Sequence, residues 1–211
     1  MTKIKLCGLR RAEDIEAAKL LKPEYIGFVF YKKSKRYISP EEAHILKSIL
    51  DSGTSRSDTD LPDHTEAVGV FVNENPKTVA DLLEQGIIDI AQLHGDEDEE
   101  YIKALRKLTD RPLIKAFKIK TKEDLKKAEV SSADMILLDA GMGDGVSFDW
   151  DLLKSFNRPY FLAGGLDPEN VGEAVNRLHP CGVDVSSGIE TDGFKDPEKM
   201  RKFVCNVRTK E

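Results

Sequence analysis

The stretch YFLAGGLDPENVGEAVNRLHPCGVDVSSGI, residues 160–189, decides the fold class because it holds one complete strand–helix–strand unit. Its apolar runs at 160–166 and 182–189 are rich in the residue types of strands that are buried on both faces. Between the runs, apolar side chains recur at the spacing of one helix face: Val171, Ala174, Val175 and Leu178. Two strands joined by a helix are typical of a parallel sheet.

The same alternation continues through the whole chain. Further apolar runs predict strands at 4–8, 25–30, 67–72, 87–95, 112–119 and 134–140. Eight strands in 211 residues leave about 26 residues per unit, which predicts an α/β fold with a single domain over 1–211, a (β/α)8 TIM barrel. A doubly wound open sheet is the structural alternative.

The segments between the runs carry helix signals. Asp167 is a suitable cap for the helix of the quoted stretch, and Pro168 suits its first turn. Asn75 before Pro76 repeats that signal in 73–84. The segments 39–50 and 121–129 are compatible with helices, and 100–108 should place three apolar residues on one helix face: Ile102, Leu105 and Leu108.

One polar segment, DSGTSRSDTDLPDH at 51–64, interrupts the alternation. Its content of Ser, Asp and Thr predicts a mobile loop. Because it follows a helix and precedes a strand, it should lie on the bottom face of a barrel, away from the catalytic face.

Composition narrows the class of protein and of partner. The charged residues sum to a net charge of −6, which argues against a nucleic-acid partner. No apolar run approaches the ~20 residues of a membrane span, and no segment resembles a secretory leader. The spacing of Cys7, Cys181 and Cys205 favours free thiols in the cytoplasm. Since no feature marks a large exposed apolar patch, we expect a monomer.

In a barrel of this type the active site lies at the C-terminal ends of the strands. The sequence predicts a ring of polar residues and glycines there: Cys7, Arg36, Asn73, Gln92, His94, Asp139, Gly164, Gly165, Asp184, Ser186, Ser187 and Gly188.

Two loops in this ring indicate a phosphate site. Gly164 and Gly165 end one strand before a helix, and the turn at 186–188 ends the last strand with Ser-Ser-Gly. Glycines allow close approach of the backbone, and free N–H groups at a helix start bind anions. Barrels often hold phosphate between the loops after strands 7 and 8. The alternative is a pair of ordinary glycine turns.

Cys7 and Asp139 form an acid–base pair of candidates at strand ends. A thiolate can remove a proton from carbon if its pKa is lowered, and a carboxyl in an apolar setting can keep its proton. We expect N–H donors to lower the pKa of Cys7 and the apolar strand end to raise that of Asp139. The alternatives are a buried packing role for Cys7 and a helix cap or surface charge for Asp139.

The remaining cysteines and histidines predict no chemistry. Cys181 belongs to the turn before the last strand, and Cys205 is expected to pack its helix against the barrel. Three histidines fall on helices or bottom loops: His44, His64 and His179. No pair has metal-ligand spacing, so we expect no metal.

Several motifs together resemble those of the phosphoribosylanthranilate isomerase family over nearly the whole chain. They occur in family order: KLCGLR, YIGFVF, KSKRYISPEEA, VGVFVN, AQLHGDE, LIKAF, ILLDA, FDW, FLAGGLDPENV and GVDVSSGIET, followed by GFKD. The resemblance implies a tryptophan-pathway enzyme without cofactor or metal. Its substrate would be N-(5-phosphoribosyl)anthranilate, converted by an Amadori rearrangement into 1-(2-carboxyphenylamino)-1-deoxyribulose 5-phosphate.

The resemblance also assigns roles to residues. Asp139 would be the general acid that protonates the ring oxygen, and Cys7 the general base that removes the C2′ proton, with Gly8 leaving room beside it. Arg36 would face the anthranilate carboxylate or ring. Asp184 would lie near the substrate amine, His94 would shape the sugar site, and Gln92 is grouped with them as substrate-binding.

The loop after strand 6 departs from the family. Where relatives carry a GGTGK- or GGSGK-like segment, this chain reads GMGDGVSFDW at 141–150, without the lysine and with Asp144 added. A basic contact from this loop is therefore in question. Two alternatives stay open: a phosphosugar isomerase of histidine biosynthesis, whose pair would be two aspartates, and a phosphate-binding barrel without catalysis.

Overall fold

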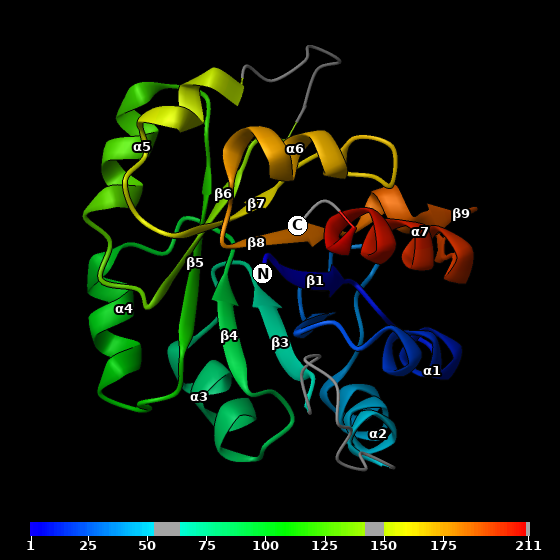
Figure 1. Ribbon diagram of the computed structural model, residues 1–211. Coiled ribbons are helices and arrows are strands. Elements are labelled where there is room, and N and C mark those ends of the chain that lie inside the picture. The colour runs from blue at the N-terminus through cyan, green and yellow to red at the C-terminus, as the bar shows by residue number, and fades with distance from the viewer. Residues whose placement is uncertain (53–63, 142–149, 210–211) are drawn as a thin grey trace.

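A closed barrel of eight parallel strands forms the centre of the computed structural model, which describes residues 1–52, 64–141 and 150–209 (Figure 1). The strands follow one another around the barrel in chain order: β1 (Lys3–Cys7), β2 (Tyr25–Val29), β3 (Glu66–Phe71), β4 (Ile90–Leu93), β5 (Leu113–Lys118), β6 (Met135–Asp139), β7 (Tyr160–Ala163) and β8 (Gly182–Val185). β8 pairs with β1 and closes the barrel, with Asp184 opposite Lys5. The predicted TIM barrel is confirmed, and the open sheet is excluded.

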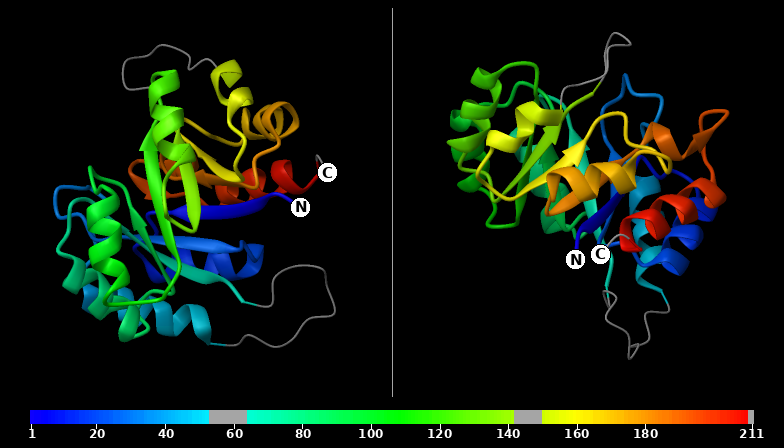
Figure 2. Two further views of the ribbon diagram at one scale, coloured as in Figure 1. Left: turned by 90° about the vertical axis from the view of Figure 1, so that its left-hand side faces the viewer. Right: turned by 45° about the horizontal axis from the view of Figure 1, so that its top comes forward.

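Seven helices surround the strands in the described ranges (Figures 1 and 2). They are α1 (Ala12–Leu21), α2 (Pro40–Asp51), α3 (Pro76–Glu84), α4 (Glu99–Arg106), α5 (Lys122–Glu129), α6 (Val171–Leu178) and α7 (Pro197–Arg208). Shorter elements are the 3₁₀ helices η1 (Trp150–Ser155) and η2 (Ser187–Ile189) and the hairpin of β9 (Glu190–Thr191) and β10 (Phe194–Lys195). Figure 1 shows α7 beside α1, so the end of the chain covers its beginning.

The helix starts follow the capping signals with one exception. The side chains of Ser39, Asn75 and Thr121 accept hydrogen bonds from the first turns of α2, α3 and α5. α6 begins at Val171, with Asn170 instead of Asp167 at its N-cap position. Asp167 makes the predicted capping bonds one turn earlier, where its side chain accepts from the N–H groups of Glu169 and Asn170.

Alternation along the strands divides the apolar residues into two cores. Residues that point outward pack against the helices, and those that point inward fill the barrel in a cluster with Tyr25, Val68, Ile114 and Phe161. Cys7, Val29 and Val70 form a separate small cluster at the ends of their strands. The inward positions of β1 also include Lys5, which is fully buried.

Two smaller predictions about packing are wrong. Cys205 is exposed on α7 rather than packed against the barrel. Leu108 lies beyond the end of α4 and is 46% exposed, so only Ile102 and Leu105 form the buried face of that helix. Most of the predicted mobile loop at 51–64 lies outside the described residues.

Candidate active site

The C-terminal ends of the strands surround a cavity of about 230 Å³. Ten of the twelve residues predicted in the ring line it: Cys7, Arg36, Gln92, His94, Asp139, Gly164, Gly165, Asp184, Ser186 and Ser187. Gly188 instead packs against the loop after β7, where a Cβ would lie 2.0 Å from the Leu166 carbonyl oxygen. Asn73, predicted in the ring, bonds to Asp96 and Glu97 outside the cavity lining.

Cys7 ends β1 at this cavity and is 7% exposed. Its neighbour on β2 is Gly27, where a Cβ would lie 2.7 Å from the Cys7 sulfur. Gly27, rather than Gly8, therefore leaves room for the thiol. At Gly8, whose φ is +80°, a Cβ would meet Arg36 Cδ at 2.5 Å, so this glycine makes space for Arg36.

The charges around Cys7 act in opposite directions on its thiol. Burial raises the pKa of Cys7, and the carboxylate of Asp184 adds to that increase. The ammonium groups of Lys5 and Lys195 lower it, but the net direction is upward from the ordinary value. The expectation of a lowered pKa for Cys7 is wrong, because burial outweighs the cations.

Asp139 ends β6 and is held by a chain of hydrogen bonds. The Gln92 amide donates to His94 Nδ1 at 2.8 Å, which leaves Nε2 to donate to Asp139 Oδ2 at 3.3 Å. The Gly141 N–H donates to Oδ1 at 2.9 Å. Burial alone would raise the pKa of Asp139, but His94 and Gly141 bring it below its ordinary value. The expected increase is therefore also wrong.

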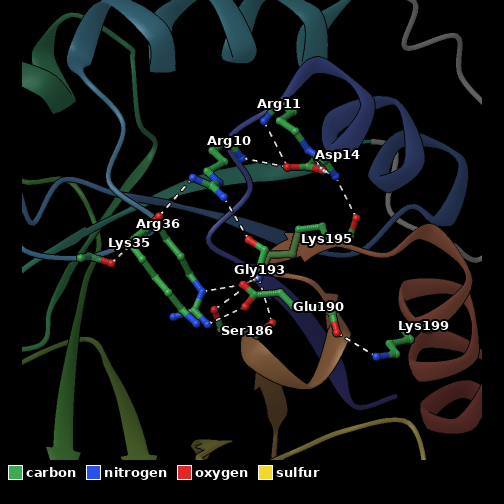
Figure 3. A network of polar contacts seen from close by, with 11 residues as sticks. Arg10, Arg11, Asp14, Lys35, Arg36, Ser186, Glu190, Gly193, Lys195 and Lys199 are labelled. Carbon is green, nitrogen blue, oxygen red and sulfur yellow. Dashed lines mark hydrogen bonds and ion pairs between the residues drawn. The ribbon is translucent and has the colours of Figure 1, made fainter.

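Arg36 reaches the cavity from the loop after β2 and is clamped by Glu190 (Figure 3). Its Nε donates to Oε1 at 2.6 Å and its Nη2 to Oε2 at 2.8 Å. Burial would raise the pKa of Glu190, but the bonds from Arg36 and Lys195 lower it to about 2. The pair uses one edge of the guanidinium, and Nη1 has no hydrogen bond to another described residue.

A wider polar network fastens the β9–β10 hairpin in place (Figure 3). Lys195 Nζ donates to Glu190 Oε1 and to the Ser186 carbonyl, both at 2.8 Å. Arg10 donates to the carbonyls of Lys35 and Gly193, at 3.1 and 3.0 Å. The loops after β1, β2 and β8 are thereby tied together around Arg36.

The two glycine loops lie next to each other across β7 and β8. Gly164 and Gly165 adopt φ values of +96° and +66°, which favour glycine. A Cβ at Gly164 would also lie 2.2 Å from the Gly141 nitrogen. The Gly165 carbonyl accepts from Asn170 Nδ2 at 2.8 Å, which pins the loop to the start of α6. Backbone groups of both loops thus border the same cavity.

Sequence reasoning missed three charged residues at this site: Lys5, Glu190 and Lys195. Lys5 lies two residues before Cys7 on β1 and therefore on the same face of the strand. This spacing was visible in the sequence, but it is also typical of a surface lysine in a half-exposed strand. Glu190 and Lys195 act through contacts that only the closed barrel creates, since Glu190 and Arg36 are 154 positions apart.

The described ranges show no feature of a metal site or of a membrane span. They contain no group of three or more His, Cys, Asp or Glu side chains arranged to hold a metal ion. No helix among those described is both long and apolar enough to span a bilayer.

Comparisons with known proteins agree on one family. The family model described as N-(5'phosphoribosyl)anthranilate (PRA) isomerase matches residues 4–206. The N-(5'-phosphoribosyl)anthranilate isomerase of Acetivibrio thermocellus is 44% identical, over 99% of this chain and 96% of the relative. A crystal structure of monomers of the dimeric isomerase from Thermotoga maritima has a TM-score of 0.83 and 34% identity, covering 99% of this chain and 100% of that one.

A second solved structure of the same enzyme type carries a ligand. It is an isomerase in complex with reduced 1-(o-carboxyphenylamino)-1-deoxyribulose 5-phosphate, with a TM-score of 0.81, 34% identity and coverage of 99% of this chain and 100% of that one. The resemblance noted in the motifs is thus confirmed by matches over the whole barrel. The chain belongs to the N-(5'-phosphoribosyl)anthranilate isomerase family and is an isomerase of tryptophan biosynthesis.

Proposed function

We propose that this isomerase converts N-(5-phosphoribosyl)anthranilate into 1-(2-carboxyphenylamino)-1-deoxyribulose 5-phosphate with Asp139 as general acid and Cys7 as general base. The observation that carries this proposal is that both side chains line one cavity, from β6 and β1. The alternative of a buried packing cysteine does not explain a thiol at the cavity wall beside three charged groups.

The reaction needs one proton delivered and one removed. Protonated Asp139 gives its proton to the furanose ring oxygen as the bond from C1′ to that oxygen breaks, which leaves a Schiff base. The Cys7 thiolate then takes the proton from C2′, and the electrons of that C–H bond form an enolamine. The enolamine tautomerises to the ketone product. General acid and base groups of this kind typically contribute about 10²–10⁴ each in rate.

The pKa directions of Cys7 and Asp139 define which protonation states of the pair are populated. Since the pKa of Cys7 is raised and that of Asp139 is lowered, the thiol holds its proton and the carboxyl is ionised at neutral pH. The reactive pair, thiolate with carboxylic acid, is a minor tautomer of the same protonation level. Catalysis therefore depends on the groups that favour the thiolate.

Substrate binding is assigned to the remaining wall of the cavity. Arg36 is oriented by Glu190, and its open edge suits the two oxygens of the anthranilate carboxylate. The backbone of the loops at 164–165 and 186–187 suits the phosphate. Asp184 faces the substrate amine, and Gln92 orients His94 toward the sugar. Residues 142–149 of the altered loop at 141–150 lie outside the described residues. The effect of the missing lysine on substrate binding therefore stays a prediction.

A fluorescence assay with freshly generated phosphoribosylanthranilate tests the proposal, because rearrangement of the N-glycoside changes the emission of the anthranilate. We expect turnover without added metal and without effect of a chelator. A folded protein that binds inorganic phosphate but gives no turnover would leave a phosphate-binding barrel and overturn the proposed reaction.

The cellular setting and assembly state are part of the same proposal. We place the enzyme in the cytoplasm, in keeping with a mechanism that needs a reduced Cys7. We expect a monomer, since large exposed apolar residues of the described ranges are scattered over different elements, such as Leu20 on α1 and Ile45 on α2. Sedimentation at several protein concentrations measures this directly, and a concentration-independent dimer would contradict it.

A further inference from the structure

We propose that Lys5, buried inside the barrel beneath Cys7, supplies the positive charge that sustains the Cys7 thiolate, with Asp184 as its counter-ion. This inference rests on the proposed role of Cys7 as base. Lys5 acts through Cys7 and not on the substrate, because no part of it lines the cavity.

The position of Lys5 follows from the strand geometry. Residues 5 and 7 of β1 are two apart, so both side chains point into the barrel, about 6.6 Å apart along the strand. Lys5 is 0% exposed and is among the largest fully buried side chains of the described ranges. It therefore forms the floor below the thiol.

Asp184 keeps this buried lysine charged. The register places Asp184 opposite Lys5, and Lys5 Nζ donates to Asp184 Oδ1 at 2.9 Å. Burial would lower the pKa of Lys5, but Asp184 and Cys7 bring it above its ordinary value. An uncompensated ammonium in a barrel core is strongly unfavourable. The pair is thus a way to hold a permanent cation next to the thiol.

Lys5 is one of several charged groups near Cys7. The groups that face the thiol are Lys5 on its own strand, Asp184 on β8, Lys195 on β10 and Arg36 after β2. Lys195 and Arg36 share the carboxylate of Glu190, whereas Lys5 is paired with Asp184. Lys5 is the cation with the largest lowering effect on the thiol.

The experiment titrates Cys7 in the ligand-free protein. A background with Cys181→Ser and Cys205→Ser leaves Cys7 as the single thiol. The rate of alkylation by iodoacetamide against pH, together with the ultraviolet absorbance of the thiolate, then gives the midpoint of Cys7. Lys5→Met should raise this midpoint by about one pH unit or more, and Asp184→Asn should lower it by a similar amount.

The opposite shifts expected for Lys5→Met and Asp184→Asn distinguish an electrostatic effect on Cys7 from a loss of packing. Loosened packing would move the midpoint in the same direction in both variants. Lys3→Met is the matched control, since Lys3 lies on the same face of β1 one layer further from Cys7 and bonds to the Tyr25 hydroxyl. It should leave the midpoint unchanged.

A double variant covers the case in which Lys5→Met does not fold. Lys5→Met with Asp184→Asn removes the pair as a neutral unit and leaves no buried charge unpaired. Its midpoint should lie about one unit or more above that of Asp184→Asn alone. Equal midpoints in these two proteins, or shifts of the same sign in the single variants, would overturn the inference.

Turnover separates this inference from the proposed reaction. If the midpoints shift as expected but Cys7→Ser retains full turnover, Cys7 is not the base and the function of Lys5 in catalysis falls with it. If Cys7→Ser is inactive and the midpoints do not move, the base role stands and the assignment of Lys5 is wrong.

Discussion

Two buried lysine–carboxylate pairs in this barrel have nearly the same exposure but different surroundings. Lys5 and Asp184 lie inside the barrel, with side chains 0% and 9% exposed, and Lys115 and Glu97 lie under the loop after β4, with 6% and 1%. Lys115 Nζ donates to the Leu93 and Gly95 carbonyls at 3.4 and 2.8 Å and to Glu97 at 3.0 Å.

The two pairs differ in how many hydrogen-bond acceptors surround the lysine. The three donors of Lys115 are matched by three oxygens, and Glu97 in turn accepts from the backbone N–H groups of Asn73 and Gly95. This pair fixes the shape of a loop. Lys5 donates to one carboxylate oxygen among the described residues, and it also interacts with the side chain of Cys7. A buried ion pair with a neighbouring reactive group is a candidate for function, whereas a saturated pair serves structure.

The largest effect is expected from removing the group that Lys5 faces. Cys7→Ser should lower kcat by about 10²–10⁴, because an alcohol is a far poorer base than a thiol at neutral pH. The thermal midpoint should stay close to wild type, since the two side chains are similar in size. Steady-state kinetics with circular dichroism checks both, and turnover above a tenth of wild type would remove Cys7 from the mechanism.

The other pair should respond in stability instead of rate. Lys115→Met leaves Glu97 buried and unpaired, which we expect to cost about 3–5 kcal/mol in the free energy of unfolding. Turnover of the folded variant should remain within a few-fold of wild type. Urea denaturation measures the loss, and Lys103→Met, in the exposed pair with Glu100, is the control with an expected cost below about 1 kcal/mol. A stable but inactive Lys115→Met protein would erase the distinction between the pairs.

A third pair, Arg36 with Glu190, tests the same distinction at the cavity wall. Glu190→Gln should raise KM about tenfold, equivalent to ~1.4 kcal/mol, since a neutral amide orients the guanidinium less well. The affinity for a product analogue without the carboxylate should not change. Glu198→Gln, which alters an exposed pair on α7, is the matched control. An equal loss of affinity for the substrate and for the analogue without the carboxylate would show that Glu190 supports the fold rather than carboxylate recognition.

The smallest effect is expected when kcat/KM is measured against pH. With a lowered pKa for Asp139 and a raised pKa for Cys7, the singly protonated pair predominates from below 3.8 to above 9.0, the ordinary values of the two groups. The reactive tautomer is a constant fraction of that form, so kcat/KM should be flat from about pH 5 to pH 8.

The substrate's own phosphate titrates near pH 6, and the pH dependence of product-analogue affinity, measured in parallel, corrects for it. A limb between about pH 5 and pH 8 that survives the correction would contradict the assigned order of the two pKa values.

The fold was predictable because its strands are buried on both faces and read as unbroken apolar runs. The site followed from the rule that polar residues at the C-terminal strand ends converge, which correctly grouped Cys7, Asp139 and Asp184. The pKa directions were not predictable. They depend on the balance of burial against partners such as His94, and that balance is set by distances in the folded chain.

Residues whose role depends on a distant partner were also beyond sequence reasoning. A lysine within KIKLC gives no sign that Asp184 will neutralise it from the other end of the chain. The prediction that Cys205 packs against the barrel was wrong for a local reason. A shift of one residue along α7 moves a side chain from the buried to the exposed face of the helix.

The closure of the barrel by β1 and β8 has a consequence for how the protein is made. Lys5 leaves the ribosome early, and its counter-ion follows 179 residues later. Until then the nascent chain cannot bury its first strand without an unpaired charge, so the order of synthesis delays closure until the last strand has emerged. Proteolysis of ribosome-bound chains of increasing length should therefore show protection of β1 only after β8 has emerged from the ribosome. A chain truncated before β8 should remain sensitive to proteases and should not persist as an inactive barrel.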